Sequence, residues 1–280
     1  MFFFPLRDDN PTASKPYFVW ALIVLCGLVF LWQLGLGEDG QYAILAYGVT
    51  PATLIGGAQL PVEINQIPPI MTVFTSMFMH GGVMHFAGNM LYLWIFGDNI
   101  EEAVGSKFRF ICFYLICGMA AAFAQAFVDP QSDIPMIGAS GAIAGMLGAY
   151  LMLYPRANVH CLVGFFIFFR MMAVPAFLVL LGWIGLQFLN LGQTGAGVAY
   201  VAHIGGFVAG MALIPFFKKR QIRLFAPAHS RPFEVERVTS QSLHIPSMVQ
   251  KRNTRHDILR DPDQQNSARP NQRHPWDDGH

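Results

Sequence analysis

The stretch Ile137–Tyr154, IGASGAIAGMLGAYLMLY, opens with Gly138-Ala139-Ser140-Gly141 and contains no charged residue. Its length is close to the roughly 20 mostly apolar residues that a bilayer-spanning helix needs. A strongly polar side chain inside such a span is costly and usually faces the protein interior or a water-filled cavity. The stretch therefore predicts a membrane helix with a candidate functional residue, Ser140, near its start.

The composition of the whole chain supports a membrane setting. Hydrophobic residues make up 54% of the 280 residues and charged residues 12%, with a mean hydropathy of +0.41. An ordinary soluble domain carries about 25% charged residues. The charge is also uneven, because 12 of the 18 Lys and Arg residues lie between Lys218 and Arg273. We therefore expect a polytopic membrane domain followed by a polar tail.

Six stretches are long and apolar enough to be predicted as spans. They are Tyr17–Leu36, Val83–Ile100, Phe108–Val128, Ile137–Tyr154, Ala173–Leu191 and Val198–Phe217. The fold class predicted is all-α, with a six-helix membrane domain over residues 17–217. Between the fourth and fifth spans, Val159–Met172 is predicted to be an interfacial or re-entrant segment. Residues 1–16 lack the features of a secretory signal peptide, so the first span is expected to remain.

The basic residues predict the orientation, since short cytoplasmic loops are enriched in Lys and Arg. With six spans, every Lys and Arg of residues 1–223 falls on one side of the membrane. The charged residues of the loops on the opposite side are all Asp or Glu. Both termini are therefore predicted to be cytoplasmic. The tail, residues 218–280, lacks hydrophobic periodicity and is predicted to be disordered.

Three of the predicted helices bring a polar residue to the same depth. With this topology the second, fourth and sixth helices run inward from the outer face, and His85, Ser140 and His203 lie near their starts. A serine and a histidine at one depth suggest a nucleophile and its base. Taken singly, either residue could be an ordinary interhelical polar contact. The common depth of all three favours a shared site.

Glycine spacing indicates how these helices approach one another. Gly141 and Gly145 lie four apart on the fourth helix, and Gly206 and Gly210 lie four apart on the sixth. Small residues at this spacing let two backbones come into contact.

These motifs resemble those of the rhomboid intramembrane serine proteases. The resemblance rests on Gly138-Ala139-Ser140-Gly141, on Ala202-His203 followed by Gly206 and Gly210, and on the segment from His80 to Asn89, HGGVMHFAGN. It covers about residues 15–217. What it implies is a compact six-helix bundle. The six-helix plan without a seventh span resembles bacterial members, which implies the bacterial cytoplasmic membrane, and a eukaryotic organelle stays open as the alternative.

The resemblance also implies roles for individual residues. Ser140 would be the nucleophile and His203 the general base of a Ser-His dyad. His85, Asn89 and the backbone N–H of Ser140 would bind the oxyanion. His80, Gly138, Gly141, Gly206 and Gly210 would support the site. One departure concerns the position four residues after the serine, where some members have an aromatic residue and this chain has Ala144.

The implied activity is cleavage of transmembrane protein substrates near the outer face of the bilayer. We expect no cofactor, no metal ion and no nucleic-acid partner. Other intramembrane proteases fit poorly, because the sequence has no HExxH motif and no pair of aspartates in two spans. Two alternatives stay open: a catalytically inactive rhomboid-like protein that binds membrane clients, and a helix-bundle transporter. The first would lack the serine or the histidine, and the second would more often show internal repeats.

Overall fold

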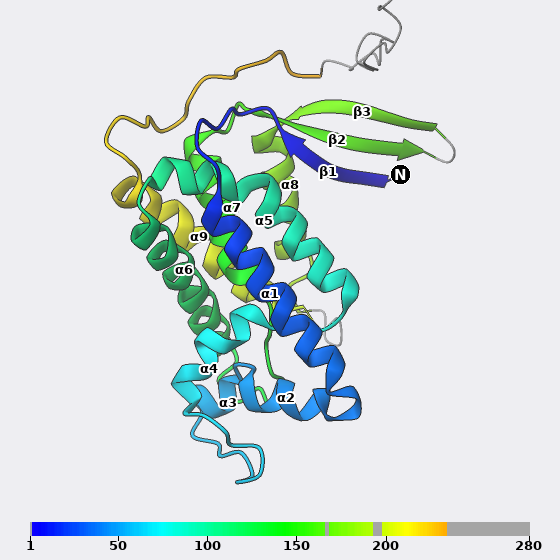
Figure 1. Ribbon diagram of the computed structural model, residues 1–280, viewed down its shortest axis with the longest axis vertical. Coiled ribbons are helices and arrows are strands. Elements are labelled where there is room, and N and C mark those ends of the chain that lie inside the picture. The colour runs from blue at the N-terminus through cyan, green and yellow to red at the C-terminus, as the bar shows by residue number, and fades with distance from the viewer. Residues whose placement is uncertain (1, 166–167, 193–197, 234–280) are drawn as a thin grey trace, which may run out of the picture. The chain divides into compact units, whose positions relative to one another are not determined.

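The computed structural model describes residues 2–165, 168–192 and 198–233, and within them the chain is mostly helical (Figure 1). The six long helices coincide with the six predicted stretches. They are α1 (Tyr17–Gly35), α5 (Val83–Val104), α6 (Lys107–Val128), α7 (Ser140–Leu153), α8 (Ala176–Leu189) and α9 (Tyr200–Phe217). By length and composition, α1, α6 and α9 are each able to cross a membrane, whereas α7 and α8 are apolar but have only 14 residues each.

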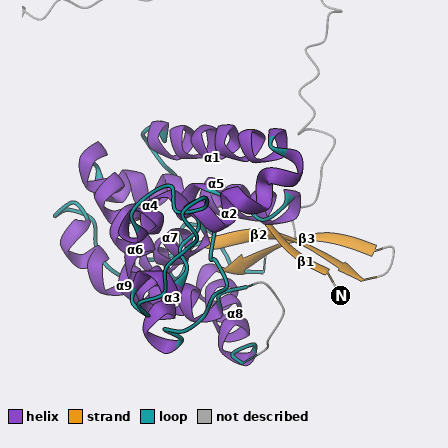
Figure 2. Ribbon diagram, turned by 90° about the horizontal axis from the view of Figure 1, so that it is seen from below, coloured by secondary structure: helices purple, strands orange, loops and turns teal. Residues whose placement is uncertain are grey.

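Helix α7 forms the buried centre of the bundle. All its residues from Ala142 to Tyr150 are buried, and it packs against α5, α6, α8 and α9. Figure 2 shows it enclosed by these neighbours. A helix that is apolar all round lies either in a protein core or across a membrane, and the burial of α7 places it in the core of this bundle.

A three-stranded antiparallel sheet includes the segment predicted to be interfacial or re-entrant. Its strands β1 (Phe2–Asp8), β2 (Asn158–Phe165) and β3 (Phe168–Pro175) lie in the order β1-β2-β3, with Phe4 opposite Leu162. The all-helical class is therefore wrong in this region, and the interfacial location of Val159–Met172 stays a prediction. Aromatic and β-branched residues favour strands once they have a partner. That partner is the N-terminal segment, more than 150 residues away in sequence.

The connection between α1 and α5 contains three short helices, α2 (Gly40–Tyr47), α3 (Pro51–Leu54) and α4 (Pro69–Thr75). They lie at the end of the bundle opposite the sheet (Figure 1). The 3-10 turns Gly37–Asp39 and Ser76–Phe78 flank them.

Hydrogen bonds connect the start of α1 and the segment that follows α9 to the rest of the bundle. The Glu101 carboxylate accepts hydrogen bonds from the backbone N–H groups of Phe18 and Val19, in the first turn of α1. Beyond α9, the backbone N–H of Lys219 donates to Ala103, and that of Phe225 donates to Met152. The disorder predicted for residues 218–280 thus does not extend over 218–233, and residues 234–280 lie outside the described part.

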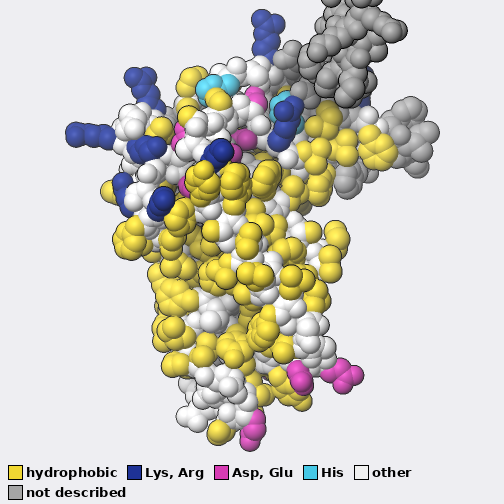
Figure 3. Space-filling model, in the orientation of Figure 1, with side chains coloured by type: hydrophobic (Ala, Val, Ile, Leu, Met, Phe, Trp, Pro, Cys, Tyr) yellow, Lys and Arg dark blue, Asp and Glu magenta, His cyan; other side chains and the backbone are white. Residues whose placement is uncertain are grey.

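Charged side chains separate between the two ends of the bundle. On the face shown in Figure 3, Lys and Arg gather at the end that carries the sheet, and at the opposite end the charged side chains are Asp and Glu. Hydrophobic side chains cover the surface between them. The exposed large hydrophobic side chains of the long helices include Leu28, Leu31, Trp94 and Phe108.

Candidate active site

Ser140 is the first residue of α7. Gly138, two residues earlier, has a φ of +129°, a backbone conformation that side chains other than hydrogen rarely allow. The chain turns sharply there and enters the helix at Ser140. This begins the helix three residues later than the sequence predicts, and leaves the Ser140 N–H among the first-turn donors that have no acceptor within the helix.

The Ser140 hydroxyl lies within hydrogen-bond distance of His203. Its Oγ is 2.9 Å from Nε2 of the imidazole, which α9 supplies from its first turn. A serine hydroxyl becomes a competent nucleophile when a neighbouring base accepts its proton. The pair has the geometry that this chemistry needs.

Glycine residues bring α7 and α9 into backbone contact. A Cβ on Gly210 would lie 2.6 Å from the Cα of Gly145, and a Cβ on Gly145 would lie 3.2 Å from the carbonyl oxygen of Gly206. On another face of α7, a Cβ on Gly141 would lie 2.6 Å from the Cβ of Ala121 on α6. The distance between Ser140 and His203 therefore depends on residues without side chains.

The other side of the imidazole is held by α8. Nδ1 of His203 lies 2.8 Å from Oε1 of Gln187, and the Trp183 ring lies 5.6 Å from the imidazole, centroid to centroid, at an interplanar angle of 35°. The sequence analysis did not single out either residue. A polar side chain within the apolar stretch Ala173–Leu191 was the signal that could have found Gln187, by the same reasoning that found Ser140.

A backbone hydrogen bond determines which nitrogen of His85 can donate. The N–H of Gly81 donates to Nδ1 of His85 at 3.3 Å, so Nδ1 is the acceptor and Nε2 carries the proton of the neutral ring. A Cβ on Gly138 would lie 2.8 Å from this Nε2 and 3.5 Å from Oγ of Ser140. Gly138 therefore leaves room for an N–H donor beside the serine.

Asn89 presents a second donor. It is 7% exposed, and its buried Nδ2 has no hydrogen-bond partner among the described residues. A buried donor without an acceptor is destabilising. Asn89 and His85 both line a cavity of about 260 Å³ together with Ser140 and His203, so an anionic oxygen in this cavity would have two donors from α5.

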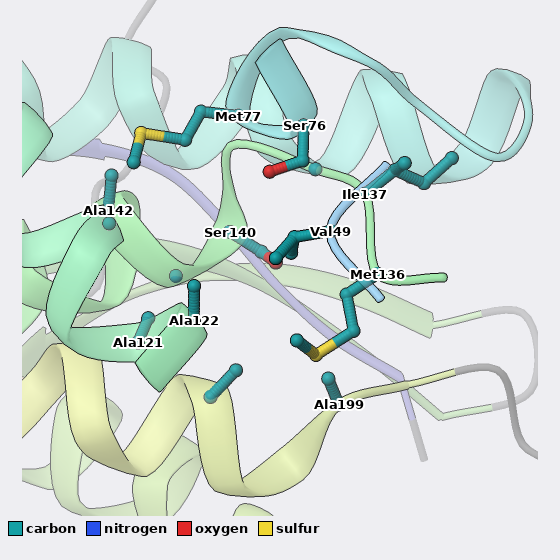
Figure 4. A pocket seen from close by; sticks show the side chains of 14 residues that line it. Val49, Ser76, Met77, Ala121, Ala122, Met136, Ile137, Ser140, Ala142 and Ala199 are labelled. Carbon is teal, nitrogen blue, oxygen red and sulfur yellow. The ribbon is translucent and has the colours of Figure 1, made fainter. Parts of the chain in front are cut away.

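A smaller cavity lies on another side of the serine. Its volume is about 50 Å³, and its walls include Ser140 and five alanines. These are Ala121, Ala122, Ala142, Ala199 and Ala202, of which the first four are labelled in Figure 4. The space accommodates a group of only a few atoms.

His80 lies beside His85 rather than at the serine. The two rings are 5.4 Å apart, centroid to centroid, and the His80 backbone N–H donates to Oε1 of Gln33 at 2.9 Å. Burial, with a smaller contribution from His85, lowers the pKa of His80 to about 4. Its imidazole is therefore neutral near pH 7. Among the described residues, no group of three or more His, Cys, Asp or Glu side chains is arranged to hold a metal ion.

A comparison with models of protein families shows which family the chain belongs to. Residues 69–220, more than half of the chain, match the model of the rhomboid domain. The chain belongs to the rhomboid family. The rhomboid segment begins with α4 and contains α5 to α9, and so includes Ser140, His203, His85, Asn89 and Gln187.

Individual rhomboid relatives are similar over much of this chain. Rhomboid protease GluP of Bacillus subtilis (strain 168) is 29% identical over 200 residues, which are 70% of this chain and 34% of the relative. RHOMBOID-like protein 12, mitochondrial, of Arabidopsis thaliana is 32% identical over 167 residues, covering 54% and 47%. Rhomboid protease GlpG of Klebsiella pneumoniae is 24% identical over 200 residues, covering 70% and 61%. The matches thus span about a third to three fifths of these relatives.

The residues singled out in the sequence come together in this rhomboid fold. Ser140, His203, His85 and Asn89 line one cavity. Gly138 and Gly141 flank the serine, and His80 contacts the far side of His85. The remaining predicted positions, Gly206 and Gly210, form the backbone contact between α9 and α7.

Proposed function

We propose that this chain is an intramembrane serine endopeptidase that cleaves transmembrane segments of membrane proteins near the outer face of the bilayer. The observation that carries the proposal is the 2.9 Å approach of Ser140 Oγ to His203 Nε2 inside an apolar helix bundle. Family membership supports it, because relatives such as GluP and GlpG are named as rhomboid proteases.

In the proposed reaction, Ser140 Oγ attacks the carbonyl carbon of the scissile peptide bond while His203 Nε2 accepts the hydroxyl proton. The tetrahedral intermediate collapses to an acyl-enzyme, and His203 returns the proton to the leaving amine. A water molecule, deprotonated by the same imidazole, then hydrolyses the ester. Serine and histidine are thereby regenerated.

Three donors are proposed to stabilise the oxyanion of the intermediate. They are Nε2–H of His85, the unpartnered Nδ2 of Asn89 and the backbone N–H of Ser140. Fixed donors placed where charge develops lower the barrier, and each is typically worth 10²–10³ in rate. The cavity of about 50 Å³ beside Ser140 would accept the side chain that precedes the scissile bond, and its small volume limits that side chain to a small one.

The proposed topology places α1 and α5 to α9 across a bacterial cell membrane with both termini in the cytoplasm. The membrane domain is residues 17–217, and residues 1–16 and 218–280 are cytoplasmic. Helix α7 has 14 residues, a length of about 21 Å, whereas the hydrocarbon core is about 30 Å thick. A short α7 beginning at Ser140 thus leaves depth above the serine for water and substrate.

Labelling of the detergent-purified full chain with a fluorophosphonate probe tests the proposal without a known substrate. Wild type is expected to label, and Ser140→Ala and His203→Ala are expected not to. Ser106→Ala and His160→Ala are matched controls, because both residues lie away from the cavity, and both should label like wild type. Absence of labelling in folded wild type would favour the client-binding alternative, and labelling of Ser140→Ala would overturn the assignment of the nucleophile.

A further inference from the structure

Gln187 is a buried polar residue to which the reaction described above gives no role. It is 8% exposed and lies in the last turn of α8, a helix whose other residues are nearly all apolar. A polar amide in this setting requires hydrogen-bond partners. Both ends of the amide have one, and the two bonds run in a defined direction.

The bond at the nitrogen end decides which way the amide faces. Nε2 of Gln187 lies 3.0 Å from the backbone carbonyl oxygen of Trp183, one turn earlier in α8. A carbonyl oxygen can only accept, so the NH₂ group must point toward Trp183. The Oε1 that lies 2.8 Å from Nδ1 of His203 is therefore an acceptor.

This direction determines the protonation of the imidazole. Since Oε1 of Gln187 accepts, Nδ1 of His203 must carry the proton. In the neutral ring Nε2 then holds the lone pair, and this nitrogen is the one 2.9 Å from Ser140 Oγ. The hydrogen bonds thus run in sequence from Ser140 to His203, from His203 to Gln187 and from Gln187 to the carbonyl of Trp183.

We propose that Gln187 is a positioning residue that selects the Nδ1–H tautomer of His203 and holds its Nε2 lone pair toward Ser140. This inference rests on the proposed function and adds a third member to the Ser140–His203 pair. The role matches that of the buried carboxylate in Ser-His-Asp triads, which orients the imidazole. An amide fulfils it here without placing a second charge in an apolar bundle.

The proposal also connects α8 to the chemistry. Ser140 is on α7, His203 is on α9 and Gln187 is on α8, so the base is correctly oriented only while all three helices are packed together. The Trp183 ring, tilted against the imidazole, comes from the same helix. A loss of packing at α8 would release the imidazole even with α7 and α9 in contact.

Four variants of the full chain in detergent separate orientation from general stability. Gln187→Leu removes the acceptor, and Gln187→Glu keeps it but introduces a negative charge. Asn190→Leu and Asn190→Asp repeat these changes at the C-cap residue of α8, whose amide donates to the carbonyl of Leu186 in the same helix. The fluorophosphonate labelling rate is measured from pH 5 to pH 9, with thermal melting to verify folding.

We expect Gln187→Leu to label about 5- to 100-fold more slowly than wild type, since a buried N–H then lacks its acceptor. In Gln187→Glu the carboxylate favours the protonated imidazole, so the acid limb of the pH–rate profile should move to higher pH by about one unit or more. His85, the other histidine of the cavity, is unchanged in every variant. Both Asn190 variants should keep the wild-type rate and profile.

Ring-¹⁵N signals of histidine provide a readout that does not depend on activity. The His203 signals are assigned by difference from His203→Ala, and wild type should show a protonated Nδ1 and an unprotonated Nε2. Gln187→Leu should show a mixture of tautomers. A wild-type Nε2–H tautomer, or a Gln187→Leu variant with unchanged tautomer and labelling rate, would overturn the inference. If wild type fails to label but shows the Nδ1–H tautomer that Gln187→Leu loses, the proposed protease function fails while the positioning by Gln187 stands.

Discussion

Gly206 of α9 faces the carbonyl oxygen of Gly141 so closely that a Cβ on Gly206 would overlap that oxygen. Gly141 directly follows Ser140, and Gly206 lies three residues after His203. The contact that closes the two helices is therefore one turn or less from the proposed catalytic pair. The separation of the helices and the distance between serine and histidine are governed by the same glycines.

Gly206→Ala should consequently abolish fluorophosphonate labelling. The new methyl group would overlap the backbone of α7, and a backbone cannot change rotamer to make room. Helices α7 and α9 must therefore separate, which moves Nε2 of His203 out of hydrogen-bond distance of Ser140 Oγ. We expect a loss of labelling greater than about 100-fold together with a lower melting temperature. Gly185→Ala is the matched control, because a Cβ there meets nothing within 4 Å. Equal labelling by the two variants would show that the glycine contact between α7 and α9 does not determine the distance between Ser140 and His203.

Asn89→Ala should lower the labelling rate without lowering the stability of the protein. If Asn89 donates to the oxyanion, the labelling rate should fall about 10²–10³-fold. Because the buried Nδ2 has no hydrogen-bond partner within the described part of the chain, its removal should leave the melting temperature unchanged or raise it. A fall in melting temperature that matches the fall in rate would indicate a structural role for Asn89.

The sequence was sufficient for local features and insufficient for long-range partners. The apolar stretches predicted the positions of α1 and α5 to α9, because a helix depends on residues near one another in the chain. The glycine spacing likewise indicated the α7–α9 contact. The β1–β2 pairing, by contrast, joins residues such as Phe4 and Leu162, and no local pattern determines that pairing.

The candidate site shows the same division. Ser140, His203, His85 and Asn89 were recognisable because they lie in short motifs. Gln187 lies in no motif, and its relation to His203 depends on how α8 packs against α9. Some rhomboids have an aromatic residue at the position of Ala144, where it packs against the catalytic histidine, so the imidazole of His203 needs another neighbour in this chain. Only the three-dimensional arrangement could identify Trp183 and Gln187 as the residues in contact with it.

Glu101 should be important for stability through α1 rather than through the site. It accepts from the N–H groups of Phe18 and Val19 at 2.9–3.2 Å, at a helix start whose N-cap residue, Pro16, makes no side-chain capping hydrogen bond. Glu101→Ala should lower the free energy of unfolding by about 1.5–3 kcal/mol, and Glu101→Gln, which keeps an acceptor, should lower it less. Glu102→Ala is the control, since Glu102 binds exposed groups of Ala13 and Ser14. Thermal melting in detergent should rank Glu101→Ala as the least stable of the three variants.

Asp8 should make the stability of the protein depend on pH. Burial raises the pKa of its carboxyl to about 7, and the carboxylates of Asp98 and Asp9 add to the effect, although the hydrogen bond from the Tyr150 hydroxyl opposes it. In the unfolded chain an Asp titrates near 3.9. Between about pH 4 and pH 7 the folded state therefore holds a proton that the unfolded state has lost, so this group makes stability fall as pH rises through that window.

Asp8→Asn removes the titrating group while keeping an oxygen that can accept from Tyr150. The variant should melt at a higher temperature than wild type at pH 8, where the wild-type carboxylate is ionised and buried. The difference should narrow at pH 5, where most of the folded wild type holds the proton. Asp133→Asn, at an exposed position, should show no such change between the two pH values. A difference between Asp8→Asn and wild type that is the same at pH 5 and pH 8 would mean that Asp8 ionises in the folded protein as it does in the unfolded chain.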